Sequence, residues 1–459
     1  MNVANPPRQL EAGKMAPAYH VGSLTYTRSQ LIVLFFWLMW NDFSLMLIEQ
    51  LNSLTGFIYK DHGATYAQMA VIGSVGGFLS MWINPAISTW SDRFRSKFGR
   101  RRPFLFFSAP LFAVTLAAIP FMPDLHDYLS GISAFQPFLA RLPLDGRVFF
   151  IAMAVILCGF FNAMLLSIFS YLYWDVVPEN VMGRFQSLST NCLFIAGLVW
   201  NFFILGWADH NIKAVYLGTS AFCLIVYLIS TWRIREGSCP PPEPRKSGGW
   251  FAPVRTYCVE CFSKPYFLWI FGGSLLFQLG NAGGMYQTFY LRYDLGLDLA
   301  TIGWTQGWAQ TVTTIFGLLC GFGIGALVDR WKPVRLLGLV YLAMAAVCVA
   351  SYFLVVDKWS YLISFSVLSV LRFCMGVVLG AFTIAVFPRD KLGQFCSAQA
   401  IFYQICLYAV GPLIGLLFDW LQNNRFGFFW MGMFYGLSGI AYLKVYGNWR
   451  KRHRIVPEQ

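Results

Sequence analysis

Two ionisable side chains lie within long apolar runs of this 459-residue chain. Asp42 is near the middle of the run 29–50, and Arg372 is near the middle of the run 360–387. If these runs cross a membrane, each charge costs on the order of 2.5–3.5 kcal/mol to insert, so a functional reason is expected. A carboxyl group in such a site can carry a proton, and a guanidinium can donate to solute oxygens or to a carboxylate. The pair therefore predicts a proton-coupling acid and a binding cation, or else a structural ion pair.

Neutral amides and indoles within the apolar runs are further candidates for binding a solute. They are Asn41, Asn162, Gln278, Asn281, Trp304 and Trp308. Aromatic faces combined with amide hydrogen bonds suit a sugar. Two structural interpretations stay open, because Trp near a helix end commonly belongs to an interfacial belt. Buried Asn and Gln often only join neighbouring helices.

Twelve apolar runs, long enough to cross a hydrocarbon core of about 30 Å, would position these residues. The chain is 57% apolar and 12% charged, whereas soluble domains average about 25% charged residues. The predicted helices are 29–50, 68–90, 103–121, 148–173, 186–206, 213–232, 266–290, 303–328, 336–356, 360–387, 395–419 and 427–446. We therefore expect an all-α membrane protein.

The basic residues predict the orientation. Seven Lys or Arg lie on the connectors of one side, Arg372 lies inside a helix, and the remaining 26 of 34 lie on the other side or in the tails. By the positive-inside rule both termini are cytoplasmic, and we expect a plasma (inner) membrane location. Residues 1–28 are predicted to be a disordered cytoplasmic tail rather than a secretory signal, and 447–459 a second tail. The net charge of +13 is therefore topogenic and does not indicate nucleic acid.

Two loop motifs occur once in each half of the chain. SDRFRSKFGRRRPF (91–104) is echoed by GALVDRWKPVR (325–335), and VPENVMGRFQSL (177–188) by FPRDKLGQFCSA (387–398). The same two motifs in the same order indicate two homologous six-helix bundles, 29–232 and 266–446. Residues 233–265, which contain Pro240 to Pro242, would be a cytoplasmic linker.

With these loops, residues 29–446 resemble the major facilitator superfamily, whose loop between helices 2 and 3 reads Gly-x-x-x-Asp-Arg-x-Gly-Arg-Arg. Ser88 replaces the leading Gly of the first copy, and Gly325 keeps it in the second. The lengthened phrase ending Phe-Gly-Arg-Arg-Arg-Pro-Phe resembles the sucrose/proton and glycoside/cation symporter branches. Sucrose-type carriers place an acid within helix 4, which residues 148–173 lack.

The resemblance implies alternating access around a mid-membrane site, with proton-coupled symport of a sugar or glycoside. Asp42 would carry the proton, and protons or Na⁺ would be the coupling ion. The implied cytoplasmic gate residues are Asp92, Arg93, Gly99, Arg100, Arg184, Gly325, Asp329 and Arg330. The alternatives are an exporter of drugs or metabolites on the same fold, and a non-transporting sensor or polytopic enzyme.

The sequence lacks the residue patterns that other classes of function require. The sequence has no nucleotide-binding fingerprint and no clustered acids or histidines, so we expect no enzyme activity and no cofactor. Cys258-x-x-Cys261 has no second pair and no nearby His, so we expect no metal site. We expect a functional monomer in the lipid bilayer.

Overall fold

The computed structural model describes residues 19–21, 23–94, 96, 98–178, 181–237, 261–262, 265–387 and 392–455. In the first half, which we call the N half (19–237), a short hairpin precedes the helices. The elements are β1 (Tyr19–Val21), β2 (Leu24–Tyr26), α1 (Arg28–Asp61), α2 (Tyr66–Arg93), α3 (Arg102–Ala118), η1 (Ile119–Phe121), α4 (Met122–Ser130), η2 (Ser133–Phe135), α5 (Gln136–Leu139), α6 (Gly146–Val176), α7 (Met182–Val199), the π-helical η4 (Trp200–Ile204) and α8 (Leu205–Arg233).

The second half, the C half (265–455), consists of helices and short connections, with no strand among its described residues. It comprises α10 (Pro265–Asn281), α11 (Gly284–Phe289), the π-helical η5 (Tyr290–Asp294), α12 (Leu299–Trp331), α13 (Pro333–Leu354), α14 (Lys358–Val386), α15 (Leu392–Leu421) and α16 (Phe426–Ile455). Of the helices in the described residues, eight are long and apolar enough by length and composition to cross a membrane.

Local sequence signals begin several of these helices. Thr27 caps α1 and Thr65 caps α2, each in a capping box that Gln30 and Gln68 complete three residues later. Asp357 caps α14, where its carboxylate accepts from the backbone N–H of Ser360 at 2.8 Å. Such caps satisfy N–H groups that have no partner inside the helix. They place the helix ends at the polar edges of the apolar runs.

The twelve predicted helices all overlap observed helical segments, and most observed helices are longer. The predicted break between the fifth and sixth helices lies at Asn211, whose φ and ψ of −149° and 58° are not helical. The prediction of a wholly disordered N-terminal tail is wrong at 19–26, where β1 and β2 pair antiparallel. Most of the predicted linker, 238–260, lies outside the described residues.

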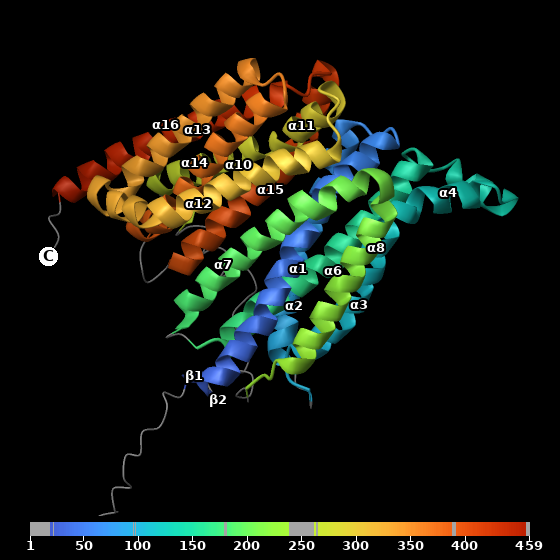
Figure 1. Cartoon of the computed structure of the whole chain (residues 1–459), viewed down its shortest axis with the longest axis horizontal. Helices are drawn as coiled ribbons and strands as arrows, with labels where there is room; N and C mark the ends of the chain where they lie inside the picture. The colour runs from blue at the N-terminus through green and yellow to red at the C-terminus, as the bar shows by residue number, and fades with distance from the viewer. Residues whose placement is uncertain are drawn as a thin grey trace, which may run out of the picture.

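The two halves lie side by side, converging at one end and diverging at the other (Figure 1). They converge where α1 approaches α11, and α2 packs along α15. Gly415 of α15 permits this approach, because a Cβ there would lie 2.6 Å from the Cα of Ala67. We call the converging end the closed end and the other the open end. The loop from α2 to α3, with its arginines, lies at the open end.

Candidate functional site

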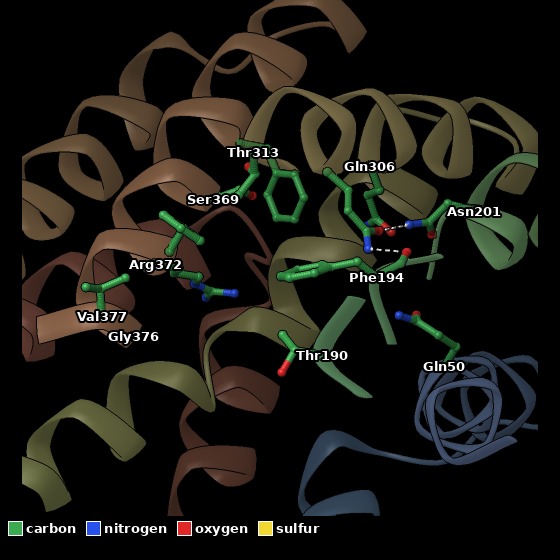
Figure 2. Close-up of a pocket in the computed structure, with 13 residues that line it drawn as sticks. Gln50, Thr190, Phe194, Asn201, Gln306, Thr313, Ser369, Arg372, Gly376 and Val377 are labelled. Atoms are coloured by element: carbon green, nitrogen blue, oxygen red, sulfur yellow. Dashed lines mark hydrogen bonds between the residues drawn. The ribbon is translucent and has the colours of Figure 1, made fainter. Parts of the chain in front are cut away.

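A cavity of about 600 Å³ lies between the halves, and its lining comes from both. α1 and the α7–η4 helix contribute from the N half, and α12 and α14 from the C half (Figure 2). The lining residues are Gln50, Thr190, Phe194, Asn201, Gln306, Gln310, Thr313, Phe365, Ser369, Arg372, Phe373, Gly376 and Val377. Amide, hydroxyl and phenyl groups dominate, with one charge. A cavity of this size and mixed lining is typical of small-solute sites.

Hydrogen bonds across the two halves hold one wall of this cavity. Asn201 donates its amide to Gln310 Oε1 at 3.2 Å, and Gln310 donates to the carbonyl oxygen of Phe194 at 3.0 Å (Figure 2). Gln310 therefore joins α12 to both η4 and α7. Gln306 and Gln310 repeat at i, i+4 in the sequence, but this contact depends on how the two halves dock, which that spacing does not predict.

Arg372 lies in this cavity, as its position in α14 predicts. Its Nη2 donates to the hydroxyl of Tyr435 at 3.2 Å. That hydroxyl donates to Asn281 Oδ1 at 2.7 Å, and Asn281 Nδ2 donates to Gln278 Oε1 at 2.9 Å. Two predicted binding amides thus form a second layer behind Arg372. They are absent from the cavity lining, and they orient the arginine through Tyr435.

Asp42 lies apart from Arg372, buried within the N half. Its side chain is 5% exposed, and its Oδ1 accepts from the hydroxyl of Tyr173 in α6 at 3.0 Å. Its Oδ2 is buried without a hydrogen-bond partner. No ion pair joins Asp42 to Arg372 among the described residues, so the alternative of a structural pair is wrong for this conformation. A buried carboxyl with one free oxygen is suited to carrying a proton.

Asn41 and Asn162 are also inside the N half rather than in the cavity lining. Asn41 is 3% exposed, and neither atom of its amide group has a partner. Asn162 lines a separate cavity of about 410 Å³ enclosed by α1, α2, α3 and α6, and its Oδ1 is buried without a partner. Unsatisfied buried amides are rare. Both side chains therefore remain candidates for contacts made in another conformation.

Trp304 and Trp308 are absent from the cavity lining, contrary to the expectation of a binding role there. They are 38% and 45% exposed. Trp304 packs edge-on against Trp359, which lies one residue into α14. The two indoles follow the i, i+4 spacing that keeps them on one helix face. Trp308 packs edge-on against Phe202 of η4 in the N half, so it contributes to the contact between the halves. The belt interpretation accounts for the exposed Trp304.

Polar contacts between the halves gather at the closed end. The carboxylate of Asp419 in α15 accepts from the backbone N–H groups of Tyr66 and Ala67 at the start of α2, each at 2.8 Å. Arg292 Nη2 lies 2.6 Å from Asp209 Oδ1, and Tyr293 donates to Asp61 at 2.8 Å. Neither Asp419 nor Asp209 has a local signature in the sequence, because the partners of each belong to the other half.

The predicted gate residues at the open end are only partly described. The side chains of Asp92, Arg93 and Asp329 lie outside the described residues, and Gly325 lies within α12. Arg184 and Arg330 are exposed. Arg100 and Arg101 pair with Asp175 at the end of α6, at 2.7 and 2.6 Å. In this conformation these arginines have a carboxylate partner within their own half.

Glu236, which follows α8, organises the same loop. Its carboxylate accepts from the backbone N–H groups of Arg100, Arg101 and Arg102 at 2.7 to 3.1 Å. These groups open α3, where an anion is favoured. Gly99 has φ of 110°, and a Cβ there would lie 2.9 Å from Glu236 Cδ. The glycine of the motif is thus required by both backbone conformation and space.

Comparison with known proteins places this geometry in a family. The model of the Major Facilitator Superfamily matches residues 31–412. The sucrose transport protein SUT4 of Oryza sativa subsp. japonica is 34% identical over 82 residues, 18% of this chain and 13% of SUT4. The multidrug resistance protein MdtG of Salmonella typhimurium is 24% identical over 260 residues, 55% of this chain and 60% of MdtG. The chain therefore matches less than two thirds of either relative.

Solved structures agree with the family match at the level of the fold. A D-xylose-proton symporter superposes with a TM-score of 0.61 at 13% identity, covering 90% of this chain and 96% of that one. The family accounts for the two halves, the cavity between them and the paired loop motifs, and it makes the protein a membrane transporter rather than an enzyme. The chain belongs to the Major Facilitator Superfamily.

Proposed function

We propose that this protein takes up a sugar or glycoside together with protons by alternating access. The observation that carries the proposal is the cavity between the halves, whose lining offers amides and hydroxyls from both sides together with three phenyl rings. Hydroxyl-rich solutes need many neutral hydrogen-bond partners, and apolar ring faces pack on aromatic side chains. The similarity of a short segment to SUT4 supports the same substrate class.

The positive-inside count assigns the open end to the cytoplasm and the closed end to the outside. The conformation is then inward-open, with both termini cytoplasmic in a plasma (inner) membrane. The units that move are the two six-helix bundles, 29–232 and 266–446. Asp419 and Arg292 hold the outer end shut. The cytoplasmic loops would meet in the opposite, outward-open state.

Asp42 is the proposed proton carrier. In the inward-open state its carboxyl accepts from the hydroxyl of Tyr173 and also has the hydroxyl of Ser189 beside it. A Na⁺ site would require several oxygen ligands around the ion. The described contacts of Asp42 supply hydroxyl donors rather than such a shell. Protons are therefore the coupling ion that this geometry favours.

An exporter is the second candidate, supported by the longer match to MdtG. The two functions differ in direction and in substrate. An exporter would move an apolar compound out of the cytoplasm, and it would not concentrate a sugar inside vesicles under an inward proton gradient.

Uptake into proteoliposomes tests the proposal. With a panel of labelled sugars and an acidic exterior, wild type should accumulate one of them above equilibrium, equally well in Na⁺ and choline buffers. Asp42→Asn should abolish accumulation and keep counterflow exchange, because exchange needs no net proton transfer. Asp357→Asn, which removes the same charge from a helix cap outside the cavity, should accumulate like wild type.

Two results would contradict these assignments. Accumulation by Asp42→Asn at the wild-type level would show that Asp42 is structural. Failure of every sugar, together with proton-driven efflux of apolar compounds, would make the protein an exporter.

A further inference from the structure

Arg372 supplies the one charge in the lining of the central cavity, and nothing described around it neutralises that charge. We propose that the transported solute carries a single negative charge, a carboxylate, which Arg372 binds. The inference rests on the proposed sugar-transport function and narrows its substrate class to acidic sugars.

The contacts of Arg372 support a missing anionic partner. A guanidinium has five N–H donors, and in the described residues one of its nitrogens, Nη2, has a partner, the neutral hydroxyl of Tyr435. Nε is buried without a partner. The other ionisable groups near it, Tyr361 and Cys348, are neutral as well. Asp42 is engaged with Tyr173, and Glu49, although next to Gln50 in α1, makes no ion pair with Arg372 and is absent from the lining.

The direction of the side chain supports a role in binding. Figure 2 shows the guanidinium of Arg372 extending from α14 towards Thr190 and Phe194 of the opposite half. The hydrogen-bond chain through Tyr435 and Asn281 fixes this direction from behind. A solute held by Arg372 therefore contacts both halves at once. Buried single charges are costly unless paired, so a cation held in place in a transport cavity favours an anionic solute.

The number of charges favours a carboxylate over a phosphate ester. A phosphate monoester carries about −1.5 to −2 at pH 7, which would leave excess negative charge beside one guanidinium. A carboxylate carries one charge and matches the planar fork of the arginine in bidentate geometry. The remaining lining, including Gln306, Ser369 and Thr313, offers neutral partners for hydroxyl groups.

A matched set of ligands tests the inference on the full-length protein in nanodiscs. Glucose, glucuronate and glucose 6-phosphate differ only in the group at C6. At pH 7 the wild type should bind glucuronate at least tenfold more tightly than glucose, and more tightly than glucose 6-phosphate. Arg372→Gln should abolish the preference, so that glucuronate and glucose bind with the same affinity, while a size-exclusion profile like that of the wild type reports that the variant is folded. Arg372→Lys should keep part of the preference.

Arg141→Gln is the matched control, because Arg141 is an exposed arginine in the loop between α5 and α6, and its loss should leave all three affinities unchanged. Equal wild-type affinity for glucose and glucuronate would overturn the inference without any variant, and it would leave the proposed sugar function intact. Preference for glucose 6-phosphate, or an equal loss of both sugars in Arg372→Gln, would also overturn it. If none of the three binds, the inference on acidic sugars is overturned as well, and the uptake panel decides the sugar function separately.

Discussion

Asp419 is the side chain through which the closure of the closed end can be tested most directly. Its carboxylate accepts two backbone N–H groups at the start of α2, each at 2.8 Å. The donors belong to one half and the acceptor to the other, so these hydrogen bonds exist only while the closed end stays shut. Replacing Asp419 therefore changes the balance between conformations.

The size of the effect follows from the chemistry of the replacement. Asn keeps one acceptor oxygen, and its NH₂ faces the second N–H, so Asp419→Asn removes one hydrogen bond to a charged group. Such a bond contributes about 1.5–3 kcal/mol, and the half-buried setting of Asp419 argues for the lower end. A loss of about 1.5 kcal/mol corresponds to a roughly tenfold shift towards the state in which this end is open.

Spin labels on the loops of the closed end measure this shift. With labels at Arg141→Cys in the N half and Asn423→Cys in the C half, in a background without other accessible cysteines, pulsed dipolar spectroscopy reports the distance between the halves. Asp419→Asn should increase the long-distance population about tenfold. Asp357→Asn is the matched control, because that carboxylate caps its own helix within the C half. A distribution for Asp419→Asn identical to that of wild type would refute the reasoning.

Three further substitutions test separate parts of the structure. Gly99→Ala should lower the free energy of unfolding by about 1–2 kcal/mol or more from the positive φ alone, and the clash with Glu236 should lower it further. Gly63→Ala is the control, because Gly63 has φ of 81° and open space around it and should show only the backbone strain. Equal melting temperatures for the two variants would contradict the role of Glu236. Phe373→Ala should weaken solute binding measured by counterflow, whereas Trp308→Ala should not, because Phe373 lines the cavity and Trp308 does not. A larger loss of binding in Trp308→Ala than in Phe373→Ala would restore a binding role to the indoles. Gly415→Ala should open the closed end in the spin-label assay, because its Cβ would meet backbone atoms of α2. An unchanged distance between the two labels would show that the helices can shift to accommodate the methyl group.

The fold could be predicted well from the sequence, because a segment that crosses a membrane must be long and apolar over its own length, which is a local property. Apolar run lengths and basic loops located the helices, and the paired motifs predicted two related halves. Asp42 and Arg372 were found because a charge within an apolar run is conspicuous. The cavity wall was predicted less well. Gln310 and Asn201 lie there, and Trp304 and Trp308 do not, because the rotation of each helix against the other half is a tertiary property.

Contacts between segments that are distant in the sequence could not be predicted from it either. Asp419 reads as an ordinary acid at the end of α15, and only the arrangement of α2 and α15 makes it a cap. Glu236 lies at the edge of the linker, yet it holds three consecutive N–H groups of the loop before α3. In both cases the donor groups are backbone atoms, which carry no sequence signal.

Proton movement coupled to the solute is the most direct test of the account. Proteoliposomes loaded with a pH-sensitive dye and held without a pH gradient receive the sugar that wild type accumulates best. We predict that the lumen acidifies as the sugar enters, that Asp42→Asn exchanges labelled sugar without acidification, and that both signals need sugar and protein together. Sugar entry through the wild type with a constant luminal pH would contradict proton-coupled transport.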